Sequence, residues 1–138
     1  MRRTIIFILI VIFTSSIKAQ KNPVYRYVNI YGHQGMTDEG NFRMMGEQNY
    51  QVILKDFEKE FKKVNNGYTD YYRMYNLIGS VKKLTLYVSL IPKELVSEED
   101  KKRKEYRVFG DKRTLEVSYN LKTKKISKPK TSMILYDL

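Results

Sequence analysis

The single histidine of the chain, His33, lies in a glycine-rich stretch that also holds two adjacent acidic residues, Asp38 and Glu39. A loop rich in glycine can bend, so it could join an imidazole and two carboxylates into an acid–base site or a metal site. One histidine with two neighbouring carboxylates is a sparse ligand set, however, and the spacing matches no catalytic or metal-binding motif. We therefore expect a surface turn over residues 32–46, with no catalytic residue, no metal and no cofactor.

Other catalytic arrangements find little support in the sequence. The chain has no cysteine, which excludes a thiol nucleophile, a zinc site of the cysteine type and disulfide bonds. Its serines lack the G-x-S-x-G setting of a hydrolase nucleophile, and there is no second histidine. A pair of carboxylates from distant positions, as glycosidases use, stays open.

Positive charge collects between residues 101 and 130, which hold twelve basic and three acidic residues. Gly110-Asp111 predicts a tight hairpin turn, which would bring the flanking segments side by side. The hairpin would gather nine cations at one end of a sheet: Lys101, Lys102, Arg103, Lys104, Lys122, Lys124, Lys125, Lys128 and Lys130. Lys112 and Arg113 would lie at the opposite end.

Such a basic end can hold an anionic partner, such as lipid phosphates, an acidic glycan or an acidic face of a protein. The alternative is that these lysines only keep turns and edge strands soluble. Nucleic acid is not an expected partner, because no aromatic residues alternate with the lysines on a shared face, as base stacking requires.

Four tyrosines recur at helical spacing: Tyr68, Tyr71, Tyr72 and Tyr75. Thr69-Asp70 can cap a short helix that runs to about Leu77, and these rings would share one side of it. A row of tyrosines can stack on sugars or anchor a protein partner, because each ring offers a large contact area at low entropic cost. The alternative is that the row packs against the sheet, with its hydroxyl groups at the rim.

The clearest element is a helix over Asn49–Asn65. Its apolar residues recur every three or four positions and share one face: Tyr50, Ile53, Leu54, Phe57, Phe61 and Val64. The outer face is expected to carry the charged residues: Lys55, Asp56, Glu58, Lys59, Lys62 and Lys63. Alternating or aromatic segments predict strands over residues 24–31, 81–92, 105–109, 113–121 and 131–136.

This order of elements predicts an α+β fold. One long amphipathic helix and one short helix are expected to pack on a four- to five-stranded antiparallel sheet. The arrangement resembles the layout of cystatin-like and nuclear-transport-factor-like folds. The resemblance is one of layout, which implies no function.

The first nineteen residues have the pattern of a cleaved secretory signal. Arg2 and Arg3 precede a run of nine apolar residues, Ile5–Phe13, and a small residue, Ala19, precedes the expected cleavage point. The alternative, a retained membrane anchor, needs roughly 20 apolar residues. We therefore expect a soluble mature domain over residues 20–138, exported to the periplasm or secreted, with 23 basic and 15 acidic residues.

These observations predict a non-enzymatic binding protein of the bacterial envelope, of unknown oligomeric state, that acts as an inhibitor, an immunity-type protein or an adaptor. Its working surface would be the basic end or the tyrosine row. Two alternatives stay open. One is a small envelope hydrolase with a site near His33, Asp38 and Glu39, and the other is adsorption to an anionic lipid or glycan.

Overall fold

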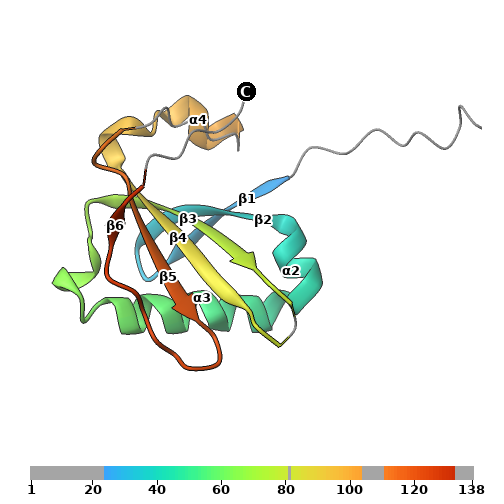
Figure 1. Ribbon diagram of the computed structural model, residues 1–138. Helices are drawn as coiled ribbons and strands as arrows, with labels where there is room; N and C mark the ends of the chain where they lie inside the picture. The colour runs from blue at the N-terminus through green and yellow to red at the C-terminus, as the bar shows by residue number, and fades with distance from the viewer. Residues whose placement is uncertain (1–23, 81, 104–110, 133–138) are drawn as a thin grey trace, which may run out of the picture.

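The computed structural model describes residues 24–80, 82–103 and 111–132, which form an α+β fold with a six-stranded mixed sheet (Figure 1). The strands are β1 Tyr25–Ile30, β2 His33–Asp38, β3 Tyr71–Ile78, β4 Thr85–Pro92, β5 Leu115–Asn120 and β6 Lys130–Thr131. The α-helices are α2 Glu39–Met45, α3 Glu47–Phe61 and α4 Glu98–Arg103. Two 3₁₀ turns, η1 Asn65–Gly67 and η2 Lys93–Leu95, follow α3 and β4. The predicted α+β class is confirmed.

The sheet follows the order of the chain, β1-β2-β3-β4-β5-β6, and only the β2–β3 pair is parallel. The prediction of four to five antiparallel strands is therefore wrong. Residues 33–38 were expected to be loop but form β2, which pairs with β1 through the two-residue turn Tyr31-Gly32. The chain then returns through α2 and α3, and a connection of this length allows β3 to lie parallel to β2.

The segment expected to form a short helix, from Thr69-Asp70 to Leu77, is instead the central strand β3. Its residues alternate between the two faces of the sheet, and it pairs with β2 on one side and β4 on the other. Aromatic residues at spacings of three and four fit a helix, but the same residues have a high preference for strands. Strand pairing on both sides decides between the two.

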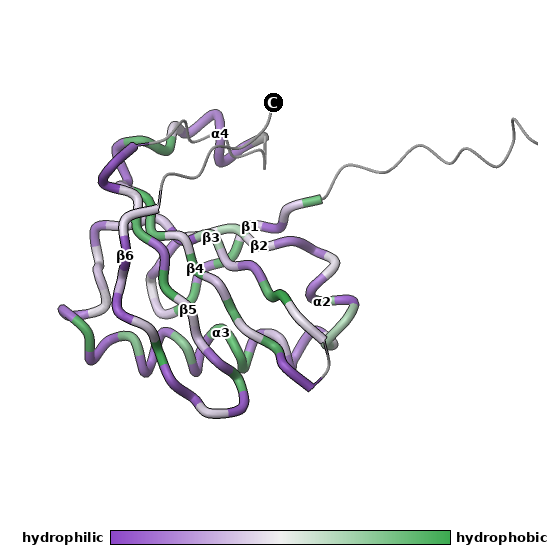
Figure 2. Tube along the Cα trace, viewed as in Figure 1, coloured by the Kyte–Doolittle hydropathy of each residue, from purple (hydrophilic) through white to green (hydrophobic). Residues whose placement is uncertain are grey.

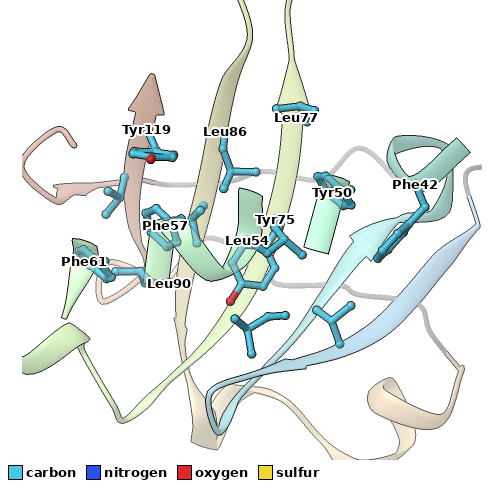
Figure 3. Close-up of a cluster of buried hydrophobic side chains, with 14 residues drawn as sticks. Phe42, Tyr50, Leu54, Phe57, Phe61, Tyr75, Leu77, Leu86, Leu90 and Tyr119 are labelled. Atoms are coloured by element: carbon cyan, nitrogen blue, oxygen red, sulfur yellow. The ribbon is translucent and has the colours of Figure 1, made fainter. Parts of the chain in front are cut away.

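The main core lies between α3 and one face of the sheet. Figure 3 shows Leu54 and Phe57 of α3 packed against side chains from β3, β4 and β5. A second buried cluster covers part of the opposite face and consists of Met36, Tyr72, Met74, Ile91 and Val96. Figure 2 shows apolar positions spaced along α3 and the central strands, with hydrophilic residues between them. Periodicity therefore predicted the helix well, although α3 ends at Phe61 rather than Asn65.

Several predicted elements lie outside the described residues. These are the secretory signal over residues 1–19, the strand over 105–109 and most of the strand over 131–136. Within the described part of the chain, no helix is long and apolar enough to cross a membrane.

Candidate functional site

A pocket of about 640 Å³ opens where the β1–β2 turn, α3 and the segment before β3 meet. Parallel pairing brings the starts of β2 and β3 to the same end of the sheet, and the antiparallel β4 ends there too. The pocket is lined by Tyr31, Gly32, His33, Glu58, Lys59, Lys62, Asn66, Thr69 and Lys93.

Beneath the pocket lies a buried ion pair between Arg73 of β3 and Glu58 of α3. Arg73 Nε donates to Glu58 Oε1 at 2.9 Å and Arg73 Nη2 donates to Oε2 at 3.3 Å, and both side chains are almost wholly buried. The hydroxyl of Tyr75 also donates to Glu58 Oε1. The prediction that Glu58 lies on the exposed face of the helix is therefore wrong. Moving two charges out of water and into a protein interior is costly. A buried ion pair fixes one arrangement of the surrounding groups only when all the donors and acceptors of the pair are hydrogen-bonded.

Arg73 meets this condition, because the backbone of the preceding turn satisfies the rest of its guanidinium. Nη1 donates to the carbonyl oxygens of Tyr68, at 2.7 Å, and Tyr71, at 3.0 Å, and Nη2 donates to that of Gly67. With the two bonds to Glu58, all five N–H groups of the guanidinium have an acceptor. Arg73 is the only charged residue in the largely apolar sequence of β3, and this is the sequence signal that could have pointed to the cluster.

The turn that surrounds Arg73 has an unusual backbone. Residues 65–68 all have positive φ angles, between 42° and 73°. Of the five non-glycine residues with positive φ in the described chain, four lie in the two turns beside the pocket: Tyr31, Asn65, Asn66 and Tyr68. Each costs conformational energy, and such residues concentrate at functional sites, where surrounding contacts hold them.

His33 begins β2 and borders the same pocket. Its Nε2 lies 3.7 Å from Glu58 Oε2, and its side chain is 17% exposed. Burial lowers the pKa of His33 below its usual value of 6.5, and the charges of Arg73 and Lys93 add to this effect against the opposing charge of Glu58. His33 is therefore neutral at pH 7 and can donate or accept a hydrogen bond.

The alternative in which His33, Asp38 and Glu39 meet in one site is wrong. These residues lie at opposite ends of the extended strand β2, about 16 Å apart at ~3.3 Å per residue. Asp38 caps α2 by accepting a hydrogen bond from the backbone N–H of Gly40 at 2.8 Å. Glu39 accepts one from Arg26 at 3.1 Å. These three residues therefore do not form the hydrolase site that was left open as an alternative.

We predict that NMR titration of the imidazole protons of His33 gives a pKa below the usual 6.5. Since His33 is the only histidine, its resonances need no assignment. Between its lowered native pKa and about 6.5, the unfolded chain binds more protons, so the free energy of unfolding falls as the pH falls. A His33→Gln variant should lose this part of the pH dependence. A native pKa at or above 6.5 would contradict the geometry described here.

The rim of the pocket is cationic. Lys59 lies on α3, Lys62 directly follows it and Lys93 follows β4, and all three are exposed. None of them forms an ion pair with the residues that the structure describes. Because Arg73 neutralises Glu58, the three lysines leave the pocket with a positive charge. The expected exposure of Lys59 and Lys62 is confirmed. Nothing in the sequence pattern predicted that they would line one pocket together with Lys93 and His33.

The predicted gathering of nine cations at one end of the sheet is wrong. Because β5 pairs directly with β4, with Leu90 opposite Leu115 and Thr85 opposite Asn120, the segments that precede and follow β5 lie at opposite ends. Figure 1 shows α4 and the turn after β5 at these two ends. Lys101 and Lys102 are on α4, Lys122, Lys124 and Lys125 are in the turn, and Lys128 and Lys130 lead back along the sheet edge. Lys104 lies outside the described residues, as does the side chain of Arg103.

Two other predicted positions also change. Arg113, expected far from residues 101–104, forms ion pairs with Glu94 and Asp111 at the end of the sheet where α4 lies. The turn after β5 instead lies beside the β3–β4 connection, since the backbone N–H of Leu121 donates to Leu84 at 3.2 Å. Five exposed lysines therefore flank this junction: Lys82, Lys83, Lys122, Lys124 and Lys125. We call this group the lysine turns.

The predicted tyrosine face does not form either. Tyr71 and Tyr75 point toward α3, whereas Tyr72 lies on the opposite face of the sheet. Tyr68 lies in the turn before β3 and stacks on Phe61, with ring centroids 5.5 Å apart. Tyr72 and Tyr75 are each only 1% exposed, so these rings belong to the packing of the fold.

Comparison with known proteins does not add a function. The chain matches no protein-family model, and it matches no curated protein and no solved structure. Among the described residues, no group of three or more histidine, cysteine, aspartate or glutamate side chains is placed to hold a metal ion. The geometry of the pocket is therefore the basis for a functional proposal.

Proposed function

We propose that this protein is a non-enzymatic binding protein of the bacterial envelope, exported by its N-terminal signal, that holds an anionic group of its partner in the pocket. The observation that carries the proposal is the ring of Lys59, Lys62 and Lys93 around a pocket whose floor is a fully hydrogen-bonded ion pair. An inhibitor, an immunity-type protein or an adaptor would each use such a surface.

The electrostatics of the pocket support this role. Three exposed lysines line one concave surface, and such a shape concentrates the field of its charges and attracts anions. The Glu58–Arg73 pair and the turn at residues 65–68 hold the floor in one conformation. A site that is already ordered loses less entropy when it binds, so its interactions contribute more fully to affinity.

A binding role also agrees with the way Glu58 is used. Its two oxygens already accept hydrogen bonds from Arg73 and Tyr75, so it is poorly placed to take a proton from a substrate. The distance of 3.7 Å between His33 and Glu58 is too long for the hydrogen bond that orients a catalytic histidine.

Sulfate is a suitable probe, because it stays doubly charged over the pH range in which the protein can be studied. We predict that an NMR titration with sodium sulfate shifts backbone resonances of the residues that line the pocket. The double variant Lys59→Gln/Lys62→Gln should weaken binding about tenfold, which corresponds to roughly 0.7 kcal/mol for each exposed cation. Sodium chloride of equal ionic strength serves as the reference.

The matched control is Lys122→Gln/Lys124→Gln, which removes the same charge from the lysine turns and should leave sulfate binding at the pocket unchanged. If this control variant loses binding and the pocket variant retains it, the working surface is the lysine turns. That result would favour adsorption to an anionic lipid or glycan and would reject the pocket.

A further inference from the structure

The pocket has an aromatic side as well as a cationic one. Tyr31 lines it and is 66% exposed, the highest value among the large apolar or aromatic residues that are exposed in the described chain. Exposed tyrosine rings that border a pocket offer a flat apolar surface beside polar groups, and such surfaces commonly take part in recognition.

The backbone conformation at Tyr31 does not favour a tyrosine, so the formation of the turn does not explain this side chain. Tyr31 and Gly32 form the two-residue connection between β1 and β2, with φ angles of 52° and 86°. Two positive φ angles in a hairpin of this length favour asparagine, aspartate or glycine at the first position. Asn29 supports the turn by accepting a hydrogen bond from the N–H of Gly32 at 3.0 Å. Tyrosine at this position is thus unfavourable for the turn, but it places a ring at the edge of the pocket.

We propose that the pocket binds an acidic sugar, an inference that rests on the proposed function of the pocket as an anion site. The apolar C–H face of a pyranose ring would lie on Tyr31, and its negative group would lie among Lys59, Lys62 and Lys93. Asn66, Thr69 and neutral His33 supply hydrogen-bonding groups for the hydroxyls.

The size and the chemistry of the pocket agree with this ligand class. A volume of about 640 Å³ falls within the ~300–1,000 Å³ that small-molecule sites occupy. Lysines alone would suit any anion, and a ring alone would suit any apolar group. The two together, with three polar side chains in the same lining, match a ligand that has an apolar face, hydroxyl groups and a negative charge.

The experiment compares three probes on the purified protein by isothermal titration calorimetry at constant ionic strength. They are trigalacturonate, which is an acidic sugar, maltotriose, which is a neutral sugar, and sulfate, which has charge but no ring. We expect trigalacturonate to bind at least tenfold more tightly than either of the others.

The key variant is Tyr31→Asn, because asparagine suits the positive φ angle of the turn and removes only the ring. It should retain or raise the melting temperature, weaken trigalacturonate binding about five- to tenfold and leave sulfate binding unchanged. Tyr31→Phe keeps the ring and should bind trigalacturonate as the wild type does.

The outcomes separate the two proposals. If sulfate binds as tightly as trigalacturonate and Tyr31→Asn changes neither, the sugar inference is overturned while the anion site stands. If trigalacturonate binds but only Lys122→Gln/Lys124→Gln weakens it, the sugar inference and the pocket both fail. If neither anion binds, both proposals fail together.

Discussion

Replacing Arg73 with methionine is expected to lower the free energy of unfolding by about 3–5 kcal/mol. The substitution leaves the Glu58 carboxylate buried without its cation. It also leaves the carbonyls of Gly67, Tyr68 and Tyr71 without the donors that now satisfy them. A loss of this size is comparable to much of the total stability of a small domain. Equilibrium unfolding in urea, followed by circular dichroism, measures it.

A second substitution keeps this prediction testable if Arg73→Met does not fold. Tyr75→Phe removes one hydrogen bond to Glu58 without changing the packing, and it should cost about 1–3 kcal/mol. The double variant Arg73→Met/Glu58→Leu removes both charges, so it should be more stable than Arg73→Met alone. If Arg73→Met costs less than about 1 kcal/mol, or if the double variant is no better than the single one, the buried pair does not have the role assigned to it.

The second large effect is expected in the core between α3 and the sheet. Phe57 is fully buried, and its ring centroid lies 5.1 Å from that of Phe61, 6.3 Å from that of Tyr75 and 5.9 Å from that of Tyr119. Phe57→Ala should lower the free energy of unfolding by about 3–5 kcal/mol, because it removes buried apolar surface and leaves a cavity.

The matched control is Val52→Ala on the same helix. Val52 is 54% exposed, so its truncation should change stability by no more than about 0.5 kcal/mol. Urea unfolding of the two variants side by side tests the orientation of α3. Similar losses for both, or a larger loss for Val52→Ala, would show that the helix packs through a different face.

Local patterns predicted the elements whose periodicity is strong. The apolar face of α3 follows the spacing of Tyr50, Leu54, Phe57 and Phe61, and all four are buried. The alternation of Leu86, Val88 and Leu90 likewise predicted β4, and that of Leu115, Val117 and Tyr119 predicted β5. In α3, in β5 and in the first half of β4, one side of the element is more buried than the other, and the alternation of residue types in the sequence follows this difference.

The parallel strand β2 was missed, because its sequence, HQGMTD, has little of the composition of a strand. Gly35 allows β2 to pack closely against β3, and this close contact, rather than flexibility, explains the glycine. A Cβ atom at Gly35 would lie 2.7 Å from the carbonyl oxygen of Arg73 on the neighbouring strand. Tertiary contacts of this kind override local preference, and a single sequence does not reveal them.

The candidate site was predicted only in pieces for the same reason. His33 was selected for its chemistry, but its neighbours Glu58 and Arg73 come from α3 and β3, 25 and 40 positions further along the chain. Lys93 reaches the rim only because β4 runs antiparallel to β3. Charge counted along the chain placed the basic region at residues 101–130, whereas the fold divides those lysines between opposite ends of the sheet.

The most direct test of the central claim is the pKa of His33, measured by NMR in sodium sulfate and in sodium chloride of equal ionic strength. An anion held by Lys59, Lys62 and Lys93 would lie beside the imidazole and stabilise its protonated form. We predict that sulfate raises the pKa of His33, and that Lys59→Gln/Lys62→Gln removes most of this increase. If the pKa of His33 is the same in both salts, the pocket does not hold an anion and the proposed function is wrong.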